Sequence, residues 1–347
     1  MLFAPKSKGF FVDQNESLIV LARTSAPSGP RVIEDITEVA PEDADAWAEV
    51  MAQYLPKKAS NALLQAVCGV YPENRLLRRL TLDLKRIKEA GYMTDLISSQ
   101  FRIDPEAYIM ALVNSADGLE YDMAKPAHGE VGVCGMRLDE VLPHQNALLE
   151  RSVYPDRLEV GSVSTVGALI DYAKFKTLPA PTLVLEMGFK TTHSYIISAN
   201  GLEASRPIPQ GLEAMVPVVQ KELGLKDEQS AQKLFYSNTF DFTGMGPALI
   251  KKLLRELQSS IGFFEVQTGQ SIGQVICTLL PPKLEWLEGA IASQLAVAPL
   301  VLDLPEWLES HKITLGDRVA GAPLSRRWLG LFSLMVQYHA APSEEKA

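Results

Sequence analysis

Residues 183–197 read LVLEMGFKTTHSYII: an apolar run, an acidic residue, a glycine, two threonines and a second apolar run. Apolar runs of this length around turn residues predict a β-hairpin whose turn begins at Glu186 and Gly188. A similar pattern opens the chain, where GFFVD (9–13) and SLIVLARTS (17–25) flank the polar turn QNE. The sequence therefore predicts an internal duplication, with one hairpin at the start of each half.

The acidic residues at the strand ends suggest a use for these hairpins. Turn amides can donate hydrogen bonds to phosphate oxygens, and a carboxylate such as Asp13 or Glu186 can bind hydrated Mg²⁺. Gly188 would allow a phosphate to approach the backbone closely. Two facing hairpins therefore predict a polyphosphate cleft, although a hairpin with an acidic turn is also a common surface structure, and the pattern alone leaves both interpretations open.

Composition limits the class of protein. The chain has 347 residues, 47% of them hydrophobic and 22% charged, which is enough for two lobes. With 33 basic and 42 acidic side chains its net charge is −9, so we expect no nucleic-acid partner. No apolar run reaches the roughly 18–20 residues that span a bilayer, so we expect a cytoplasmic protein without direct membrane insertion.

The cysteines and histidines offer no metal site. Cys68, Cys134 and Cys277 lie far apart among apolar residues, a pattern that predicts reduced, buried thiols. The five histidines are scattered singly, without the paired spacing that zinc sites use. We expect His193 to lie at a strand edge and face solvent.

The order of the predicted elements carries a family resemblance. It runs from the first hairpin through an inserted module to SVSTVGALIDY (162–172), then the second hairpin, a long helix at 247–267, a strand at 272–280 and a helix. This order resembles the actin-like ATPase superfamily, and within it the branch of the type IV pilus assembly protein PilM and the cell-division protein FtsA. LEMGFKTTHSYIISANGLEASRPIPQGL (185–212) and ELGLKDEQSAQKL (222–234) are similar to successive motifs of that branch.

The resemblance implies an α/β fold of two actin-like lobes, each of the duplicated ribonuclease H-like type, with a small inserted α+β subdomain called 1C. It implies a first lobe, 1A, of residues 1–83 and 159–180, a 1C-like subdomain of residues 84–158, and a second lobe, 2A, of residues 181–347. A 2B-like insertion is expected within the second lobe at about 212–265.

The resemblance also implies a nucleotide cleft between the lobes. Asp13 and Glu186 are its expected Mg²⁺ ligands, if the metal is bound. The expected cleft residues are Asp13, Gln14, Asn15, Glu186, Gly188, Lys190, Thr191, Thr192, Thr278, Leu279 and Leu280.

Departures from the family pattern predict that this cleft is degenerate. The family motif Asp-x-Gly-x-x-x-x-Lys is DQNESLIV here, and the glycines expected at the base-binding site are replaced by TLLPPK (278–283). Each lost hydrogen bond to a charged ligand is worth roughly 1–3 kcal/mol. We therefore expect no catalytic residues and predict no firm cofactor, while weak binding of ATP and Mg²⁺ through Lys190 stays open.

The implied function is a cytoplasmic, PilM-like scaffold of a type IV pilus or related type II secretion platform, peripheral to the inner membrane. Its implied partner is the cytoplasmic peptide of a PilN-like bitopic membrane protein, bound in a groove near 1A and 1C that involves the strands RLLRRLTLD (75–83) and EVGVCGMRL (130–138). Contacts with other platform proteins are also implied, and self-association stays open. Arg75, Arg78 and Arg79 could contact an acidic or carbonyl-rich partner, or lie on a solvated strand face.

Two alternatives have other requirements. An active, polymerising FtsA-like ATPase would use an amphipathic C-terminal helix to reach the membrane, whereas this sequence ends in PSEEKA. A small-molecule kinase on the same fold would need an intact phosphate cradle and a catalytic base. Both alternatives stay open from the sequence.

Overall fold

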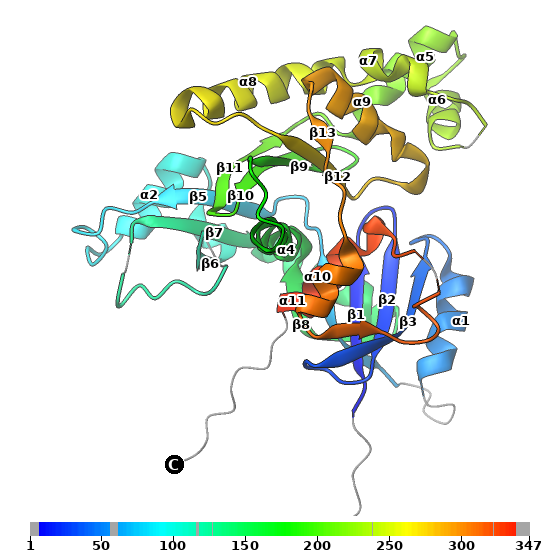
Figure 1. The fold of residues 1–347 in the computed structure, drawn as a ribbon, viewed down its shortest axis with the longest axis horizontal. Helices are drawn as coiled ribbons and strands as arrows, with labels where there is room; N and C mark the ends of the chain where they lie inside the picture. The colour runs from blue at the N-terminus through cyan, green and yellow to red at the C-terminus, as the bar shows by residue number, and fades with distance from the viewer. Residues whose placement is uncertain are drawn as a thin grey trace, which may run out of the picture.

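The computed structural model describes residues 7–55, 62–115, 118–126, 128–237, 239–321 and 323–337. Two lobes, each built around its own β-sheet, are joined by helix α4 (Gly161–Phe175), and a smaller third sheet lies beside them (Figure 1). Within these ranges no helix combines the length and the apolar character that crossing a membrane requires.

The first lobe contains a six-stranded sheet in the order β14-β3-β2-β1-β4-β8. Strands β1 to β3 form an antiparallel meander, and β4 runs parallel to β1. Helix α1 begins at Ala44, where the Asp43 side chain accepts a hydrogen bond from the Ala46 amide and caps the first turn. The bounds in this lobe are β1 (Gly9–Gln14), β2 (Ile19–Thr24), β3 (Arg31–Val39), α1 (Ala44–Tyr54), β4 (Leu64–Val70), α3 (Leu138–Glu150) and β8 (Val153–Val160).

The second lobe contains a five-stranded sheet in the order β11-β10-β9-β12-β13. Strands β9 to β11 form an antiparallel meander, and β12 runs parallel to β9. The predicted single helix at 247–267 is a short α7 followed by a long α8. The bounds are β9 (Thr182–Met187), β10 (Thr192–Ser198), β11 (Gly201–Ile208), α5 (Val216–Leu223), α6 (Glu228–Phe235), α7 (Gly246–Leu249), α8 (Lys251–Thr268), β12 (Gln274–Thr278), α9 (Trp286–Leu295) and β13 (Ala298–Pro299).

The two large sheets share one connectivity, which confirms the predicted duplication. In both, a three-stranded meander is followed by a strand that pairs in parallel with the first strand of the meander. The hairpin turns after β1 and β9 therefore occupy equivalent positions in the two lobes.

The inserted module forms a three-stranded sheet in the order β5-β7-β6. Its strand β5 (Leu76–Thr81) pairs with β7 (Glu130–Arg137), although the expected boundary at residue 83 places this strand in the first lobe. Because the partner lies about fifty residues later, the sequence of β5 alone gives no sign of the pairing. The module also contains α2 (Tyr92–Phe101) and β6 (Tyr108–Asn114).

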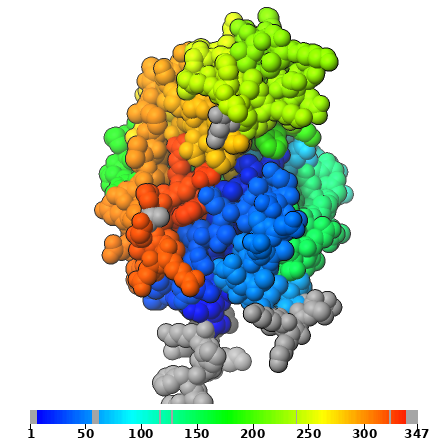
Figure 2. All heavy atoms as spheres, turned by 90° about the vertical axis from the view of Figure 1, so that its right-hand side faces the viewer, coloured from blue at the N-terminus to red at the C-terminus, as the bar shows by residue number. Residues whose placement is uncertain are grey.

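The end of the described chain returns to the first lobe, which differs from the expected second lobe of residues 181–347. Strand β14 (Ile313–Leu315) pairs in parallel with β3. Helices α10 (Leu304–Ser310) and α11 (Leu329–Gln337) pack in the core that contains α4. In Figure 2 the red-orange residues of this return lie between the blue first lobe and the yellow-orange second lobe. The full set of expected domain boundaries stays a prediction.

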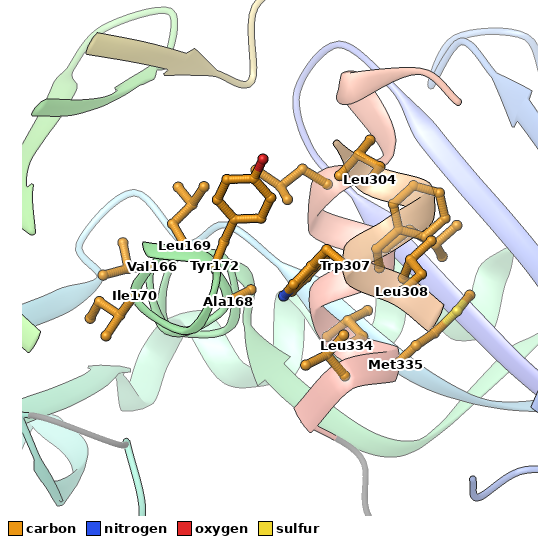
Figure 3. Close-up of a cluster of buried hydrophobic side chains, with 14 of the residues drawn as sticks. Val166, Ala168, Leu169, Ile170, Tyr172, Leu304, Trp307, Leu308, Leu334 and Met335 are labelled. Atoms are coloured by element: carbon orange, nitrogen blue, oxygen red, sulfur yellow. The ribbon is translucent and has the colours of Figure 1, made fainter. Parts of the chain in front are cut away.

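The central core joins the lobes through α4. Leu169 and Tyr172 of α4 lie in one buried cluster with Trp307 of α10 and Leu334 of α11, and Figure 3 shows side chains from the three helices converging. A separate cluster fills the second lobe beneath α5 to α9. Helix α4 is buried along most of its length, and its Ser162 hydroxyl donates a hydrogen bond to Glu186 at the end of β9.

Candidate functional site

The carboxyl group of Asp13, at the end of β1, is buried inside the first lobe. Its Oδ1 accepts a hydrogen bond from the Tyr71 hydroxyl at 3.1 Å. Helix α11 crosses directly beside it, since a Cβ at Gly330 would lie 2.3 Å from Asp13 Oδ2. Burial raises the pKa of Asp13 to about 7 from 3.8, and nearby Glu186 adds to the shift. Asp13 lines a cavity of about 30 Å³, which is too small for a hydrated metal ion.

The backbone amides of the first hairpin turn donate hydrogen bonds to a side chain of the same turn. Asn15 Oδ1 accepts hydrogen bonds from the Ser17 amide at 2.9 Å and the Leu18 amide at 3.0 Å. An asparagine side chain that closes a turn in this way substitutes for an external acceptor. These two donors are therefore not directed at a phosphate. Gln14, at the end of β1, is half-buried, and its Oε1 has no hydrogen-bond partner among the described residues.

The carboxylate of Glu186, at the corresponding position in the second hairpin, is fully buried and paired with an arginine. Arg75 donates to Glu186 Oε2 from Nη2 at 3.1 Å and from Nε at 3.3 Å. The hydroxyls of Ser162 and Tyr195 donate to the same oxygen at 2.6 and 3.2 Å. The other oxygen, Glu186 Oε1, is buried without a hydrogen-bond partner among the described residues. Because Arg75 already supplies a positive charge beside this carboxylate, a Mg²⁺ bound here would lie next to a guanidinium.

The two hairpins contact each other directly. The Phe189 amide, in the turn after β9, donates to Glu16 Oε2 at 2.9 Å. Glu16 lies in the turn after β1, so a carboxylate of one lobe occupies an anion-binding position of the other. Gly188 is required for the turn itself, because a Cβ there would lie 2.7 Å from the Thr191 carbonyl oxygen. The approach of a phosphate to the backbone at Gly188 stays a prediction.

The remaining residues of the second turn have local roles. The Lys190 side chain is exposed, and its Nζ lies 3.8 Å from Glu73 Oε1. The Thr192 hydroxyl is buried and donates to the Gln210 carbonyl at 2.7 Å. Thr191 is half-buried at the edge of the cleft. Of these three, Lys190 alone presents a charge to the opening.

The segment expected to contact a nucleotide base lies at the end of β12. Leu279 has a left-handed backbone, with φ of 62°, a conformation that normally favours glycine. The side chain of Leu280 is buried in the core of the second lobe, and the Thr278 hydroxyl is buried without a partner among the described residues. Leucine thus keeps a glycine-like backbone here while adding side-chain bulk.

The returning C-terminal segment ties the lobes together behind this turn. Arg326 donates to Glu288 of α9, whose other oxygen accepts the Cys277 amide at 2.7 Å. Arg327 lies 3.2 Å from Glu38 in the first lobe and 3.4 Å from Glu285 in the second. These ion pairs connect the lobes without a ligand.

Little space remains between the hairpins. The cavity there measures about 80 Å³, compared with roughly 300–1,000 Å³ for typical small-molecule sites. Among the described residues no cluster of three or more His, Cys, Asp and Glu side chains could bind a metal. The residues present therefore do not fit a Mg²⁺–nucleotide complex in this conformation. The cavity is lined by Asn15, Glu16, Ser17, Tyr71, Glu73, Arg75, Met187, Gly188, Phe189, Lys190, Thr191, His193 and Leu279.

Residues of both turns line the cavity between the hairpins, and Asp13 lines a neighbouring cavity of about 30 Å³ with Thr278, Leu279 and Leu280. Glu186 lines neither cavity and is buried beside Arg75. The prediction that His193 faces solvent is wrong: the ring is 7% exposed and stacks on Tyr195. Burial, with Arg75 and Arg78 nearby, lowers the pKa of His193 to about 3. Sequence reasoning missed Glu16, Tyr71 and the pairing of Arg75, since their partners lie far away along the chain.

Known structures share this architecture. A chain of the PilM-PilN type IV pilus biogenesis complex superposes with a TM-score of 0.64 over 96% of this chain and 98% of that chain, at 16% sequence identity. The chain has the two-lobed actin-like fold. That agreement confirms the fold prediction and the structural resemblance to PilM.

Other solved structures match less well. The ethanolamine utilization protein EutJ from Carboxydothermus hydrogenoformans has a TM-score of 0.44 at 11% identity and covers 96% of this chain and 90% of its own. The cytoplasmic domain of EpsL from the type II secretion system of Vibrio cholerae has a TM-score of 0.39 at 11% identity, covering 84% and 94%. No family model and no curated protein match the sequence.

Proposed function

We propose that this chain is a scaffold of a type IV pilus or related secretion assembly platform, which binds a short segment of a PilN-like membrane protein and reaches the inner membrane from the cytoplasm through that partner. The observation that carries the proposal is the replacement of ligand contacts by side chains: Glu16 at the Phe189 amide and Arg75 at Glu186. The fold shared with a chain of the PilM-PilN complex supports the choice of partner.

The internal contacts favour a scaffold over an ATPase. A nucleotide whose phosphates and metal took these positions would displace Glu16 from the Phe189 amide and disturb the buried pair of Arg75 and Glu186. Breaking a buried charge pair on one side costs roughly 3–5 kcal/mol, and each 1.4 kcal/mol is a factor of ten in affinity. We infer that nucleotide binding is at best weak and that the cleft residues predicted from the sequence are a vestigial site.

A groove between the small sheet and α4 is the proposed partner site. Its cavity measures about 130 Å³, and most of its surface is apolar. Val163, Val166 and Ile170 of α4 form one wall, while Leu77 and Val113 of the small sheet form the other. Since side chains alternate along a strand, Ile109 of β6 lies on the same face as Val113, and it is 55% exposed.

This geometry suits a short extended peptide with apolar side chains. Gly132 of β7 keeps the floor of the groove low, because a Cβ there would lie 2.9 Å from the Val113 side chain. Peptides that bind beside strands are recognised through backbone hydrogen bonds and pockets for alternate side chains. The strands 75–83 and 130–138 named from the sequence both contribute to this groove.

A binding titration tests the proposal. A fluorescently labelled peptide of the cytoplasmic N-terminal residues of the PilN-like protein from the same organism should bind the full chain saturably. Ile109→Glu should weaken binding about tenfold or more, because it buries a charge against the peptide. Val266→Glu is the matched control, since Val266 is 88% exposed on α8 of the other lobe. Absence of saturable binding to the wild-type chain would overturn the proposal.

A further inference from the structure

The small sheet and the second lobe meet edge to edge without forming a continuous sheet. Strand β5 lies beside β11, yet the two strands belong to different sheets. Arginine side chains take the place of a backbone ladder: Arg78 donates to the Ser205 carbonyl at 3.2 Å, and Arg79 donates to the Glu203 carbonyl at 3.3 Å. The two arginines thereby supply hydrogen-bond donors to carbonyls on the outer edge of β11, which would otherwise lack a partner strand.

The two arginines straddle this edge. Because successive side chains of a strand point to opposite faces, Arg78 and Arg79 leave β5 on opposite sides of its sheet, and both reach the backbone of β11. Arg79 also pairs with the Glu203 side chain at 2.9 Å and with Glu130 of β7 at 2.8 Å. The edge of β11 is therefore held from both faces.

Arg75, three residues before Arg78, makes a third contact of this segment with the second lobe. Its guanidinium, 6% exposed, lies just before β5 and pairs with Glu186 of β9. Three arginines from one short segment of the inserted module thus bind three sites on the second lobe. Within the described chain, all three arginines contact the second lobe, a role that the sequence did not indicate.

The start of β11 contributes a side chain to the proposed partner groove. Leu202, at the start of β11, donates its amide to the Ser115 carbonyl at 3.2 Å. Its side chain is 4% exposed, packs in the cluster that contains α4, and lines the groove opposite Val113. The groove is therefore built from both lobes and the inserted module, and its Leu202 wall belongs to the second lobe.

We propose that Arg78 and Arg79 are positioning residues that hold the β11 edge in place, while Arg75 anchors β9 of the same sheet, so that Leu202 closes the partner groove only when the lobes are held together. The shape of the groove and the closure of the lobes are then linked. If closure of the lobes strengthens binding of a partner that requires Leu202, binding of that partner stabilises the closed arrangement by the same free energy. This inference rests on the proposed peptide groove, but the position of β11 can be measured without a peptide.

Hydrogen exchange of the full chain tests the link. Arg78→Ala and Arg79→Ala should each speed exchange of the Leu202 amide and its β11 neighbours by about tenfold, while β1 and β2 stay protected. Arg78→Lys keeps a cationic donor and should restore most of the protection. Arg86→Ala is the control, because Arg86 lies in the same module and pairs only with the exposed Glu89 among the ion pairs of the described residues.

The peptide titration completes the test. The Arg78→Ala and Arg79→Ala variants should bind the PilN-like peptide several-fold more weakly than wild type, with Arg78→Lys close to wild type. Unchanged exchange in β11 would overturn the inference, and so would faster exchange with unchanged affinity. If the wild-type chain binds no peptide, the proposed function fails, and the exchange data alone decide whether the arginines hold β11.

Discussion

Arg75 and Glu186 lie about a hundred residues apart in sequence and form the buried ion pair at the centre of the cleft. Removing one member of a buried pair leaves the other charge uncompensated and typically costs about 3–5 kcal/mol. Arg75→Ala should therefore lower the urea midpoint of unfolding strongly. The double variant Arg75→Met/Glu186→Gln should recover much of that loss, because it removes both charges. Equal destabilisation by the single and double variants would contradict the pairing.

The raised pKa of Asp13 predicts the direction in which the stability of the folded protein changes with pH. Its pKa is 3.8 in a model peptide and about 7 in the folded chain, so the folded state binds more protons between these values. The stability from protonated Asp13 is fully present below about pH 4 and is lost as the pH rises through 7. His193, with its pKa lowered to about 3, acts in the opposite sense between 3 and 6.5.

Comparison with Asp13→Asn isolates the carboxyl contribution, because His193 titrates in both proteins. The amide keeps an acceptor for the Tyr71 hydroxyl and carries no charge. Relative to wild type, the variant should be more stable near pH 8 than near pH 5, as measured by urea midpoints at the two values. A difference between variant and wild type that does not change with pH would show that Asp13 titrates normally.

At the scale of elements, the two hairpin turns are joined by Glu16. Glu16→Ala should free the Phe189 amide and speed its hydrogen exchange, since the amide loses its acceptor. Glu73→Ala is the matched control, because Glu73 lines the same cavity and its nearest described ion-pair partner, Lys190, is exposed. Similar exchange at Phe189 in the Glu16 variant and the wild type would exclude the proposed contact.

Helix α11 approaches β1 closely because residue 330 is glycine. A Cβ there would lie 2.3 Å from Asp13 Oδ2 and 2.6 Å from the Tyr71 hydroxyl, so Gly330→Ala should cost roughly 1–3 kcal/mol. Gly262→Ala in α8 meets no atom within 4 Å and should be neutral or stabilising by up to about 1 kcal/mol. Thermal unfolding of both variants measures the contrast, and equal effects would argue against close packing at Gly330.

Much of the fold at this scale follows from the sequence. The alternating and continuous apolar runs at 9–25 and 183–197 predict both hairpins, and their repetition predicts the duplicated sheets. The pairing of β5 with β7 does not follow from the sequence, because its partner lies far along the chain. The pairing of β14 with β3 does not follow either, because a strand of three residues is too short to show an alternating pattern. Pattern arguments describe local structure, whereas these pairings depend on tertiary packing.

At the scale of the whole molecule, ion pairs and hydrogen bonds connect the lobes around the cleft predicted to bind a nucleotide. Glu16 and Arg75 act at the hairpins, Arg326 and Arg327 act behind β12, and the arginines of β5 act at the β11 edge. The sequence could show that family glycines and a lysine were missing. It could not show what replaces them, since each replacement pairs residues from different segments.

Calorimetric titration of the full chain with ATP and Mg²⁺ tests the central claim most directly, namely that side chains of the chain fill the positions a nucleotide would use. The account predicts no saturable binding tighter than about millimolar, corresponding to no more than about 4 kcal/mol of binding free energy. Saturable binding of one ATP per chain with a micromolar Kd would contradict it.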